Sequence, residues 1–314
     1  MKPIRIGTRG SKLALYQAHH VAGLLKREGL SSEIIPIETK GDKILDVSIS
    51  KIGSKGVFTE ELEDKLAEGS IDIAVHSAKD MQSVLPDGFE LIAFTEREKV
   101  NDVILSHRAS IEYRNPDVPL VLGTSATRRI ATLKHFYPHI QTVEVRGNLQ
   151  TRIAKMEDGL CDALLLAYAG AHRMEYDHLI RHELSLDEFT PAVGQGSIAV
   201  EIYRGLDISL QDKIKAAAHH VETGYRLLAE RSYLAVLEGG CSIPVFALAS
   251  IMNGELSIKG GIMSLDGSQR ISHQVTGELE NSVELGQQLA HKVLSSGGDK
   301  ILAVIKKTLN KNDQ

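Results

Sequence analysis

The chain has 314 residues, of which 42% are hydrophobic and 25% are charged, as expected for an ordinary globular protein. This length predicts about two or three domains, and cores of this size need no disulfide or metal for stability. The 36 basic and 41 acidic residues give a net charge of -5, which argues against a general nucleic-acid binder. Tryptophan is absent and aromatic residues make up 4%, which argues against base-stacking platforms and aromatic membrane belts.

The cysteine content and the N-terminus indicate the compartment. Cys161 and Cys241 are too few for a disulfide framework or a CxxC zinc site. The N-terminal segment lacks the uninterrupted apolar core of a secretory signal. An apolar run at residues 163–171 is too short to span a bilayer. We therefore expect a cytoplasmic protein with reduced thiols and no membrane partner.

The first part of the chain alternates short apolar runs with helical periodicity, which is typical of an α/β fold. Ser11 can cap the N-terminus of one helix, which Gly29 can end, and Thr59 can cap another. The predicted strands occupy residues 3–7, 34–39, 71–75 and 90–94.

The same alternation restarts near residue 119. Strands are predicted at 119–123, 142–145 and 163–170, and helices begin within 124–136 and at Asn148. Residues 3–15 and 119–131 share a strand, a Gly-Thr step and a helix start. This similarity suggests two related α/β lobes.

The last third has a different pattern. Residues 208–238 predict a helix that is interrupted or bent near Gly224, and residues 282–310 predict one or two helices. Between them, three apolar segments are separated by the hairpin signals Asn253-Gly254 and Asp266-Gly267. We expect an α+β domain whose antiparallel sheet carries helices on one face.

Arginines gather where predicted strands lead into helices, at the edge of an α/β sheet where ligands bind. Helix N-termini there present free N–H groups, and the guanidinium fork binds carboxylate or phosphate. A cation at a helix N-terminus costs about 0.3–1 kcal/mol, which a bound anion removes. The group predicts a polyanionic ligand, and the alternative for each member is a solvated surface arginine. Its members are Arg9, Arg128, Arg129, Arg146 and Arg152.

Two other cationic segments leave alternatives open. Lys79 and Asp80 follow the strand at 71–75, where the carboxylate could stabilise a cation or move protons, or could form a local ion pair or turn cap. Lys51 and Lys55 lie in a glycine-containing loop without the spacing of a nucleotide P-loop, so a mobile surface loop explains them equally well.

Histidine and cysteine offer weaker signals. His178 and His182 are four residues apart, as metal ligands on a helix would be, but no acidic or cysteine partner accompanies them. We expect solvated or structural histidines and no metal. Cys161 is expected to be a buried small hydrophobe. Cys241 follows a Gly-Gly pair beyond a helix end, where either a reactive or a structural thiol is consistent with the sequence.

Eight segments, in this order and spacing, resemble the porphobilinogen deaminase (hydroxymethylbilane synthase) family over nearly the whole chain. They are GTRGSKLAL at 7–15, TKGD at 39–42, KIGSKGVFTEELE at 51–63, DIAVHSAKD at 72–80, GTSATRR at 123–129, VRGNLQTR at 145–152, AVGQG at 192–196 and LEGGCSIP at 237–244.

The resemblance implies three domains: two periplasmic-binding-protein-like α/β lobes and a smaller α+β C-terminal domain. Domain 1, residues 1–97 and 195–215, would be discontinuous and would carry the catalytic aspartate. Domain 2, residues 98–194, would bind anions and the cofactor, and domain 3, residues 216–314, would carry the cofactor-bearing cysteine.

The resemblance also implies the chemistry. Four porphobilinogen molecules would be condensed head to tail with release of ammonia, giving linear hydroxymethylbilane for tetrapyrrole and haem biosynthesis. A dipyrromethane cofactor would be joined to Cys241 by a thioether, Asp80 would be catalytic, and the protein would be a monomer without metal. The cofactor- and substrate-binding candidates would be Arg9, Ser11, Lys79, Ser125, Arg128, Arg129, Arg146, Arg152 and Arg173, with Lys51, Lys55 and Phe58 as flexible-loop candidates.

Several positions depart from the family pattern. Ala126 replaces a second serine, Ala78 a larger apolar residue and Gln82 the usual proline, Lys99 stands in an acid's usual place, and GSKG replaces the more common GGKG. These departures leave open a low-activity relative. The other alternative is a two-lobed, non-enzymatic carboxylate-binding or sensor protein, which gives no reason for Cys241 in its loop.

Overall fold

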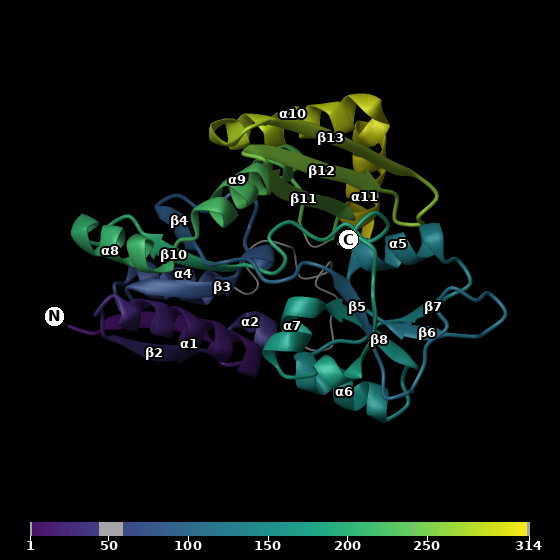
Figure 1. Ribbon diagram of the computed structural model, residues 1–314, viewed down its shortest axis with the longest axis horizontal. Coiled ribbons are helices and arrows are strands. Elements are labelled where there is room, and N and C mark those ends of the chain that lie inside the picture. Colours follow the sequence, from purple (N-terminus) through teal and green to yellow (C-terminus); the bar gives the residue numbers. More distant parts are fainter. Residues whose placement is uncertain (1, 44–58, 241, 313–314) are drawn as a thin grey trace.

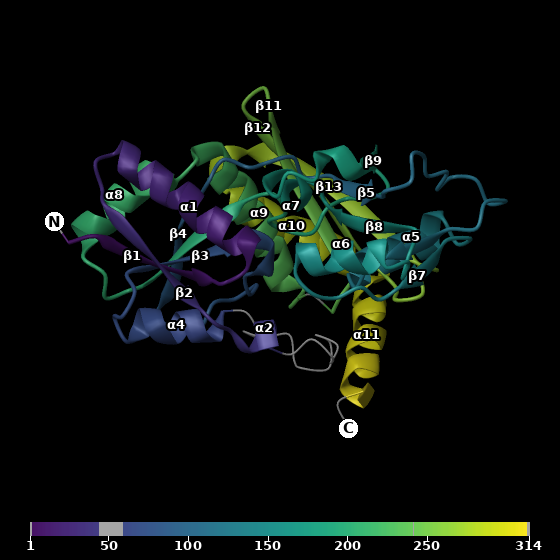
Figure 2. The same cartoon turned by 90° about the horizontal axis from the view of Figure 1, so that it is seen from below.

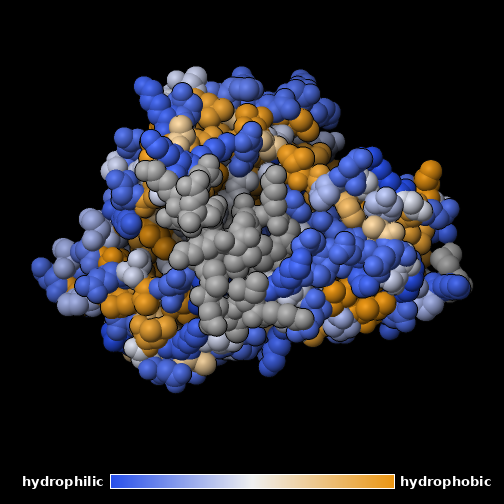
Figure 3. All heavy atoms as spheres, turned by 180° about the vertical axis from the view of Figure 1, so that it is seen from behind, coloured by the Kyte–Doolittle hydropathy of each residue, from blue (hydrophilic) through white to orange (hydrophobic). Residues whose placement is uncertain are grey.

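The computed structural model describes residues 2–43, 59–240 and 242–312. These residues form three β-sheets, two with five strands and one with three (Figure 1). On the face shown in Figure 3, hydrophobic residues form several separate patches among hydrophilic ones. Within the described ranges, no helix has the length and apolar character needed to cross a membrane.

The first lobe is built on a five-stranded sheet with the order β2-β1-β3-β10-β4. Strand β1 runs parallel to β2 and β3, whereas β10 is antiparallel to both its neighbours. Ser11 caps α1, as predicted, because its Oγ accepts a hydrogen bond from Ala14 N at 3.3 Å. The elements are β1 (Ile4–Arg9), α1 (Lys12–Arg27), β2 (Ser32–Ile37), α2 (Lys40–Lys43), α4 (Glu60–Ala67), β3 (Ile73–Ser77), η1 (Ala78–Asp80), β4 (Phe89–Phe94), β10 (Ile198–Tyr203) and α8 (Ile208–Ala218).

The second lobe repeats this arrangement in the order β7-β6-β8-β5-β9, again with an antiparallel strand next to the parallel ones. The two related sheets confirm the predicted pair of α/β lobes. The elements are β5 (Asp102–Leu105), β6 (Val121–Gly123), α5 (Thr127–Phe136), β7 (Gln141–Val143), α6 (Leu149–Glu157), β8 (Ala163–Ala167), α7 (Tyr168–Arg173), η2 (Asp177–Leu179) and β9 (Ile180–Glu183).

The chain passes between the lobes twice, and the two passages lie side by side. Glu98 N donates to Gly196 O at 3.1 Å, and Thr95 N donates to Ile198 O at 3.0 Å. Gly194 has a φ of 76°, and a Cβ there would lie 2.8 Å from the carbonyl carbon of Ala78, so glycine is required at this approach. The second passage therefore places β10 inside the first sheet.

The C-terminal part is an antiparallel sheet covered by helices, as predicted. Leu256 and Ile258 face α9 and α10, whereas Phe246 and Met263 on the opposite face contact Ala131 of α5. Helix α11 projects beyond the sheet (Figure 2). The elements are α9 (Val221–Val236), β11 (Val245–Met252), β12 (Glu255–Met263), β13 (Arg270–Glu278), η3 (Leu279–Asn281), α10 (Ser282–Val293), η4 (Leu294–Gly298) and α11 (Asp299–Asn312).

Several predicted elements were wrong in detail. The expected strand 163–170 ends at Ala167, and the small residues that follow form α7. The break expected near Gly224 lies at residues 219–220 instead. Gly224 lies within α9, where an added Cβ would be 2.6 Å from the His219 ring, so this glycine makes room for a histidine. Strands β5, β9 and β10 were missed.

Candidate functional site

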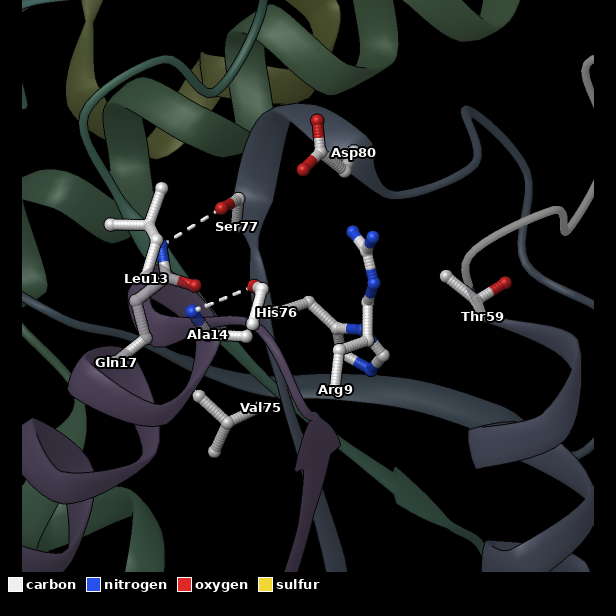
Figure 4. A pocket seen from close by; sticks show the side chains of 10 residues that line it. Arg9, Leu13, Ala14, Gln17, Thr59, Val75, His76, Ser77 and Asp80 are labelled. Carbon is white, nitrogen blue, oxygen red and sulfur yellow. Dashed lines mark hydrogen bonds between the residues drawn. The ribbon is translucent and has the colours of Figure 1, made fainter. Parts of the chain in front are cut away.

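A pocket opens at the carboxyl ends of β1 and β3, where parallel strands bring their following loops together (Figure 4). It has a volume of about 430 Å³, including its open mouth. Three predicted site residues, Arg9, Ser11 and Asp80, meet here, and the Arg9 side chain extends toward Asp80. The lining residues are Arg9, Ser11, Leu13, Ala14, Gln17, Thr59, Val75, His76, Ser77 and Asp80.

Buried polar side chains fix the walls of this pocket. Thr8 Oγ1 donates to Ala14 O at 3.2 Å, which holds the β1–α1 loop against the helix start. Gln17 Nε2 donates to Ser77 Oγ at 2.8 Å and joins α1 to the end of β3. The sequence reasoning missed Gln17, although a glutamine within the apolar periodicity of α1 was an available signal.

Lys79 and Asp80 lie close enough to the second lobe to interact electrostatically with its charged residues. Asp80 is exposed and Lys79 is half-buried in η1. Burial lowers the pKa of Lys79, and Arg129 and Arg152 of the second lobe lower it further, whereas Asp80 and Asp102 raise it. The end of β3 therefore shares one electrostatic environment with α5 and α6.

Arg128 and Arg129 differ from the expected open cations. Both are 6% exposed, and both donate to the Asp102 carboxylate, with Nη2 to oxygen distances of 2.7 Å. Arg128 Nη1 also donates to Thr190 O, and Gln195 Nε2 donates to Asp102 Oδ1 at 3.0 Å. Although burial opposes its ionisation, these guanidiniums hold the pKa of Asp102 well below its usual range. Asp102 of the chain itself therefore supplies the negative charge that balances these two arginines at the start of α5.

The other second-lobe candidates have more varied surroundings. Arg152 Nε donates to Gly147 O at 2.8 Å, and burial together with Arg129 lowers its pKa to about 10, although Asp80 raises it. Arg146 pairs with Glu144, and Ser125 Oγ donates to Val145 O at 2.8 Å. Arg152 and Lys79 therefore lie close to other positive charges, with Asp80 nearby, and an anionic ligand would reduce the repulsion between these cations.

Arg173 lies apart from this pocket. Its Nη2 donates to Gly196 O at 2.7 Å at the passage between the lobes. It lines a different pocket, together with Tyr16, His20 and Glu98. Arg173 is therefore not brought together with Arg9, Ser11 and Asp80.

Four candidates, Cys241, Lys51, Lys55 and Phe58, lie outside the described residues. Cys161 is a buried core residue, as predicted, and burial raises the pKa of its thiol.

His178 and His182 do not share a helix, contrary to the spacing considered above. His178 lies in η2 and His182 in β9, where its Nε2 contacts the Ile111 carbonyl. The two rings therefore lie on different elements, a 3-10 helix and a strand, and His182 is a structural histidine.

The departures from the family pattern have definite surroundings. Ala126 is the N-cap of α5 and provides no side-chain cap, whereas Ala78 is buried in the core. Gln82 Nε2 donates to Glu63 Oε1 at 3.2 Å and to Thr59 Oγ1 at 3.3 Å. Thr59 thus sits at the N-cap of α4, but its hydroxyl accepts from Gln82 instead of capping the helix.

The structure also reveals polar residues that the sequence reasoning did not single out. Asp102 lies three residues after Lys99, and Gln195 lies in the AVGQG segment that resembles the family pattern. His76 Nε2 pairs with Glu201 Oε2 beside the pocket. The contacts of Asp102 and Glu201 span many residues, so local spacing carried no signal for them.

Lys79 of the first lobe and Arg129 and Arg152 of the second form a cationic cluster, which is the chemistry suited to carboxylated ligands. Comparison with protein families gives the particular family. Residues 4–210 match the model of the porphobilinogen deaminase dipyromethane cofactor binding domain, and residues 225–295 match that of the porphobilinogen deaminase C-terminal domain. The chain therefore belongs to the porphobilinogen deaminase family.

Curated relatives cover the whole length. A porphobilinogen deaminase of Desulfosudis oleivorans is 53% identical over 304 residues, covering 97% of this chain and 98% of that protein. One of Cytophaga hutchinsonii is 54% identical over 312 residues, covering 99% of each. Among solved structures, the periplasmic VFT2 domain of Bordetella pertussis BvgS is 18% identical, with a TM-score of 0.41 over 68% of this chain and 86% of that chain.

The donor set fits a dipyrromethane, whose rings carry several carboxylates. Arg152 and Lys79 both have lowered pKa values because they are buried near other cations. Asp102 is already engaged by two guanidiniums, and its effect together with that of Asp80 leaves the pKa of Lys79 below its ordinary value. Carboxylates of a bound ligand would supply the missing negative charge.

Proposed function

We propose that the chain acts as a hydroxymethylbilane synthase, with its chemistry in the pocket of Arg9, Ser11 and Asp80. The family membership identifies a transferase with a dipyrromethane cofactor and sets aside the non-enzymatic alternative. The reaction joins four porphobilinogen molecules head to tail, releases ammonia at each step and yields linear hydroxymethylbilane for tetrapyrrole biosynthesis. The observation that carries the assignment of the site is the convergence of Arg9, Ser11 and Asp80 in one pocket.

The cationic residues would hold the carboxylates of substrate and cofactor. When bound through Cys241, the dipyrromethane supplies the anchored pyrrole chain that accepts each new unit. Lys79 and Arg152 would bind the carboxylates directly, because an ammonium or guanidinium near other cations gains most from an added anion. Arg9 would bind a carboxylate from its place in the pocket wall. Ser11, Ser125 and Arg146 would add polar contacts. Lys51, Lys55 and Phe58 remain loop candidates for the same task.

The buried arginines would act mainly through their charge. Arg128 and Arg129 already donate to Asp102, so fewer of their N–H groups remain for a ligand. Their position beside the pocket still adds a fixed positive field, and Arg129 lowers the pKa of Lys79. Arg173 lies at the passage between the lobes, so it would contact a ligand only at the edge of the site.

Asp80 would stabilise positive charge on the substrate. Loss of ammonia from porphobilinogen leaves a cationic pyrrole ring, and an ionised carboxylate stabilises this cation more than the neutral ring that precedes it. Asp80 is exposed at the end of η1 and faces the pocket, so the carboxylate can reach a ring held by Arg9 and Ser11.

The proposal includes the domain division and the setting. The boundaries would be residues 1–97 with 195–215, residues 98–194, and residues 216–314. The position of β10 within the first sheet supports a discontinuous first domain. The resemblance to the family supports a monomer that works in the cytoplasm.

Incubation with porphobilinogen tests the proposal. We expect one ammonia released per porphobilinogen consumed, together with a linear bilane, and saturation of the rate with substrate. An Asp207→Ala variant, which removes the cap of α8 away from the pocket, serves as a matched control and should retain the activity. Binding of porphobilinogen without release of ammonia would contradict the assignment.

A further inference from the structure

A buried histidine–carboxylate pair lies at the side of the pocket. His76 stands on β3 and Glu201 on the neighbouring antiparallel strand β10. The His76 Nε2 to Glu201 Oε2 distance is 2.9 Å, and their side chains are 5% and 0% exposed. A pair so fully removed from water is held in one geometry.

The pair leaves one nitrogen for the pocket. A carboxylate oxygen of Glu201 can only accept, so we assign the proton of the neutral His76 ring to Nε2, which leaves the lone pair of Nδ1 to accept a proton. Among the described residues, no group hydrogen-bonds to Nδ1. His76 lines the same pocket as Arg9 and Asp80.

Charged groups surround the pair from every neighbouring element. Glu63 of α4 is buried, and its pKa is raised by burial and by Glu201, although His76 lowers it. Arg231 of α9 attracts Glu201, and Arg9 and Asp80 approach from the pocket side. Within the described part of the chain, Glu201 Oε1 is buried without a hydrogen-bond partner. Such an arrangement is destabilising by itself, which favours a functional explanation.

We propose that His76, oriented by Glu201, accepts the proton that each coupling of pyrrole rings releases, an inference that rests on the proposed function. Coupling forms one carbon–carbon bond and breaks the carbon–nitrogen bond of the aminomethyl group and one pyrrole α-carbon–hydrogen bond. The electron pair of that carbon–hydrogen bond restores the aromatic ring. After the carbon–carbon bond has formed, His76 takes the proton at Nδ1 and passes it to the ammonia already set free by cleavage of the carbon–nitrogen bond, which then diffuses away as ammonium.

This assignment separates two tasks. Asp80 stabilises the cation, whereas the imidazole of His76 takes up and releases the proton. Glu201 fixes the tautomer of His76 and stabilises the imidazolium while it exists. Glu201 acts through His76 and is therefore a positioning residue.

Deuterated substrate tests the proton transfer. We expect His76→Gln to lower kcat by about a hundredfold with little change in KM, since a positioned general base contributes this much or more. With porphobilinogen deuterated at its unsubstituted α-carbon, the variant should show a larger isotope effect than the wild type, because proton removal becomes rate-limiting. Asp80→Asn should lower kcat without enlarging the isotope effect. Imidazole in solution should partly restore the activity of His76→Ala.

Two further measurements separate this role from a structural one. In the resting protein, nitrogen NMR should show His76 with a protonated Nε2 and an unprotonated Nδ1, and Glu201→Gln should change these signals and lower kcat. His219→Gln, which alters a half-buried histidine between α8 and α9 outside the pocket, should leave kcat and the isotope effect unchanged. Thermal unfolding of each variant reports on the fold.

The outcomes also separate this inference from the proposed function. A wild type that releases no ammonia from porphobilinogen contradicts the proposed function itself. A wild type that is active, beside a folded His76→Gln variant with unchanged kcat and no enlarged isotope effect, overturns only the role of His76. A protonated Nδ1 in the neutral resting ring would overturn it as well.

Discussion

The two lobes contain related sheets, but their cationic loops have opposite environments. In the first lobe, Arg9 extends into an open pocket beside the exposed carboxylate of Asp80. In the second lobe, Arg128 and Arg129 are almost fully buried, and Asp102 lies within hydrogen-bond distance of both. The same sequence signal, an arginine where a strand leads into a helix, therefore has two structural outcomes.

The difference depends on where the counter-charge comes from. A buried guanidinium is tolerated when a carboxylate of the same chain pairs with it, and the resulting cluster holds two segments together. Where the chain supplies a smaller counter-charge, as around Lys79 and Arg152, the site is suited to an anionic ligand. The first arrangement contributes to stability and the second to binding, and variants of each should separate the two.

Asp80→Asn should have the largest effect, and only on catalysis. The substitution removes the charge that stabilises the cationic ring, so we expect turnover to fall by roughly a hundredfold to a thousandfold. Because Asp80 is exposed, the midpoint of thermal unfolding should stay close to that of the wild type. Near-normal formation of bilane would remove Asp80 from this role.

Asp102→Asn should have the opposite pattern. It leaves two buried guanidiniums without a full counter-charge, so we expect the free energy of unfolding to fall by about 3–5 kcal/mol. Asp72→Asn is a comparison variant, because Asp72 pairs with Arg5 in a half-buried site and should therefore lose less free energy than the fully buried Asp102. Denaturant unfolding measures both, and equal losses would contradict the comparison.

The same carboxylate predicts a dependence on pH. The pKa of Asp102 lies below its ordinary value of 3.8 in the folded protein, because Arg128 and Arg129 outweigh the effect of burial. The ionised group therefore stabilises the fold fully above about pH 4, and this contribution decreases as the pH falls toward the folded-state pKa. Acid unfolding of Asp102→Asn should show a weaker pH dependence below about pH 4 than the wild type, and parallel curves would speak against it.

Ser11→Ala should have the smallest effect and should affect both properties. Loss of the cap of α1 should lower the free energy of unfolding by about 1 kcal/mol. Since Ser11 also lines the pocket, the KM for porphobilinogen should rise. Asp207→Ala removes the corresponding cap of α8, which lies away from the pocket, and should reduce stability alone. An equal rise of KM in both variants would mean that Ser11 acts only as a cap.

Much of the fold and part of the site could be predicted because the signals are local. The cap at Ser11, the Asn253-Gly254 turn and the restart of the α/β pattern near residue 119 depend on neighbouring residues, and the structure has them all. Parallel strands gather their loops at one edge, so placing Arg9 and Asp80 together needed only the strand order.

Contacts between distant segments could not be predicted in this way. Asp102 meets arginines more than 20 residues away, and His76 meets Glu201 across 125 residues. Nothing in local periodicity indicates that β10 returns to the first sheet, which is the step that creates the His76–Glu201 pair. A strand that is buried on both sides also lacks the alternation that identifies strands, as Asp102–Leu105 illustrates.

The mass of the purified protein tests the central claim most directly. A transferase that builds a pyrrole chain on its own cofactor should be heavier than its sequence by one dipyrromethane, carried on the peptide that contains residue 241. The Cys241→Ala variant should have the unmodified mass and no activity. A wild type with the unmodified mass and full activity would contradict the account.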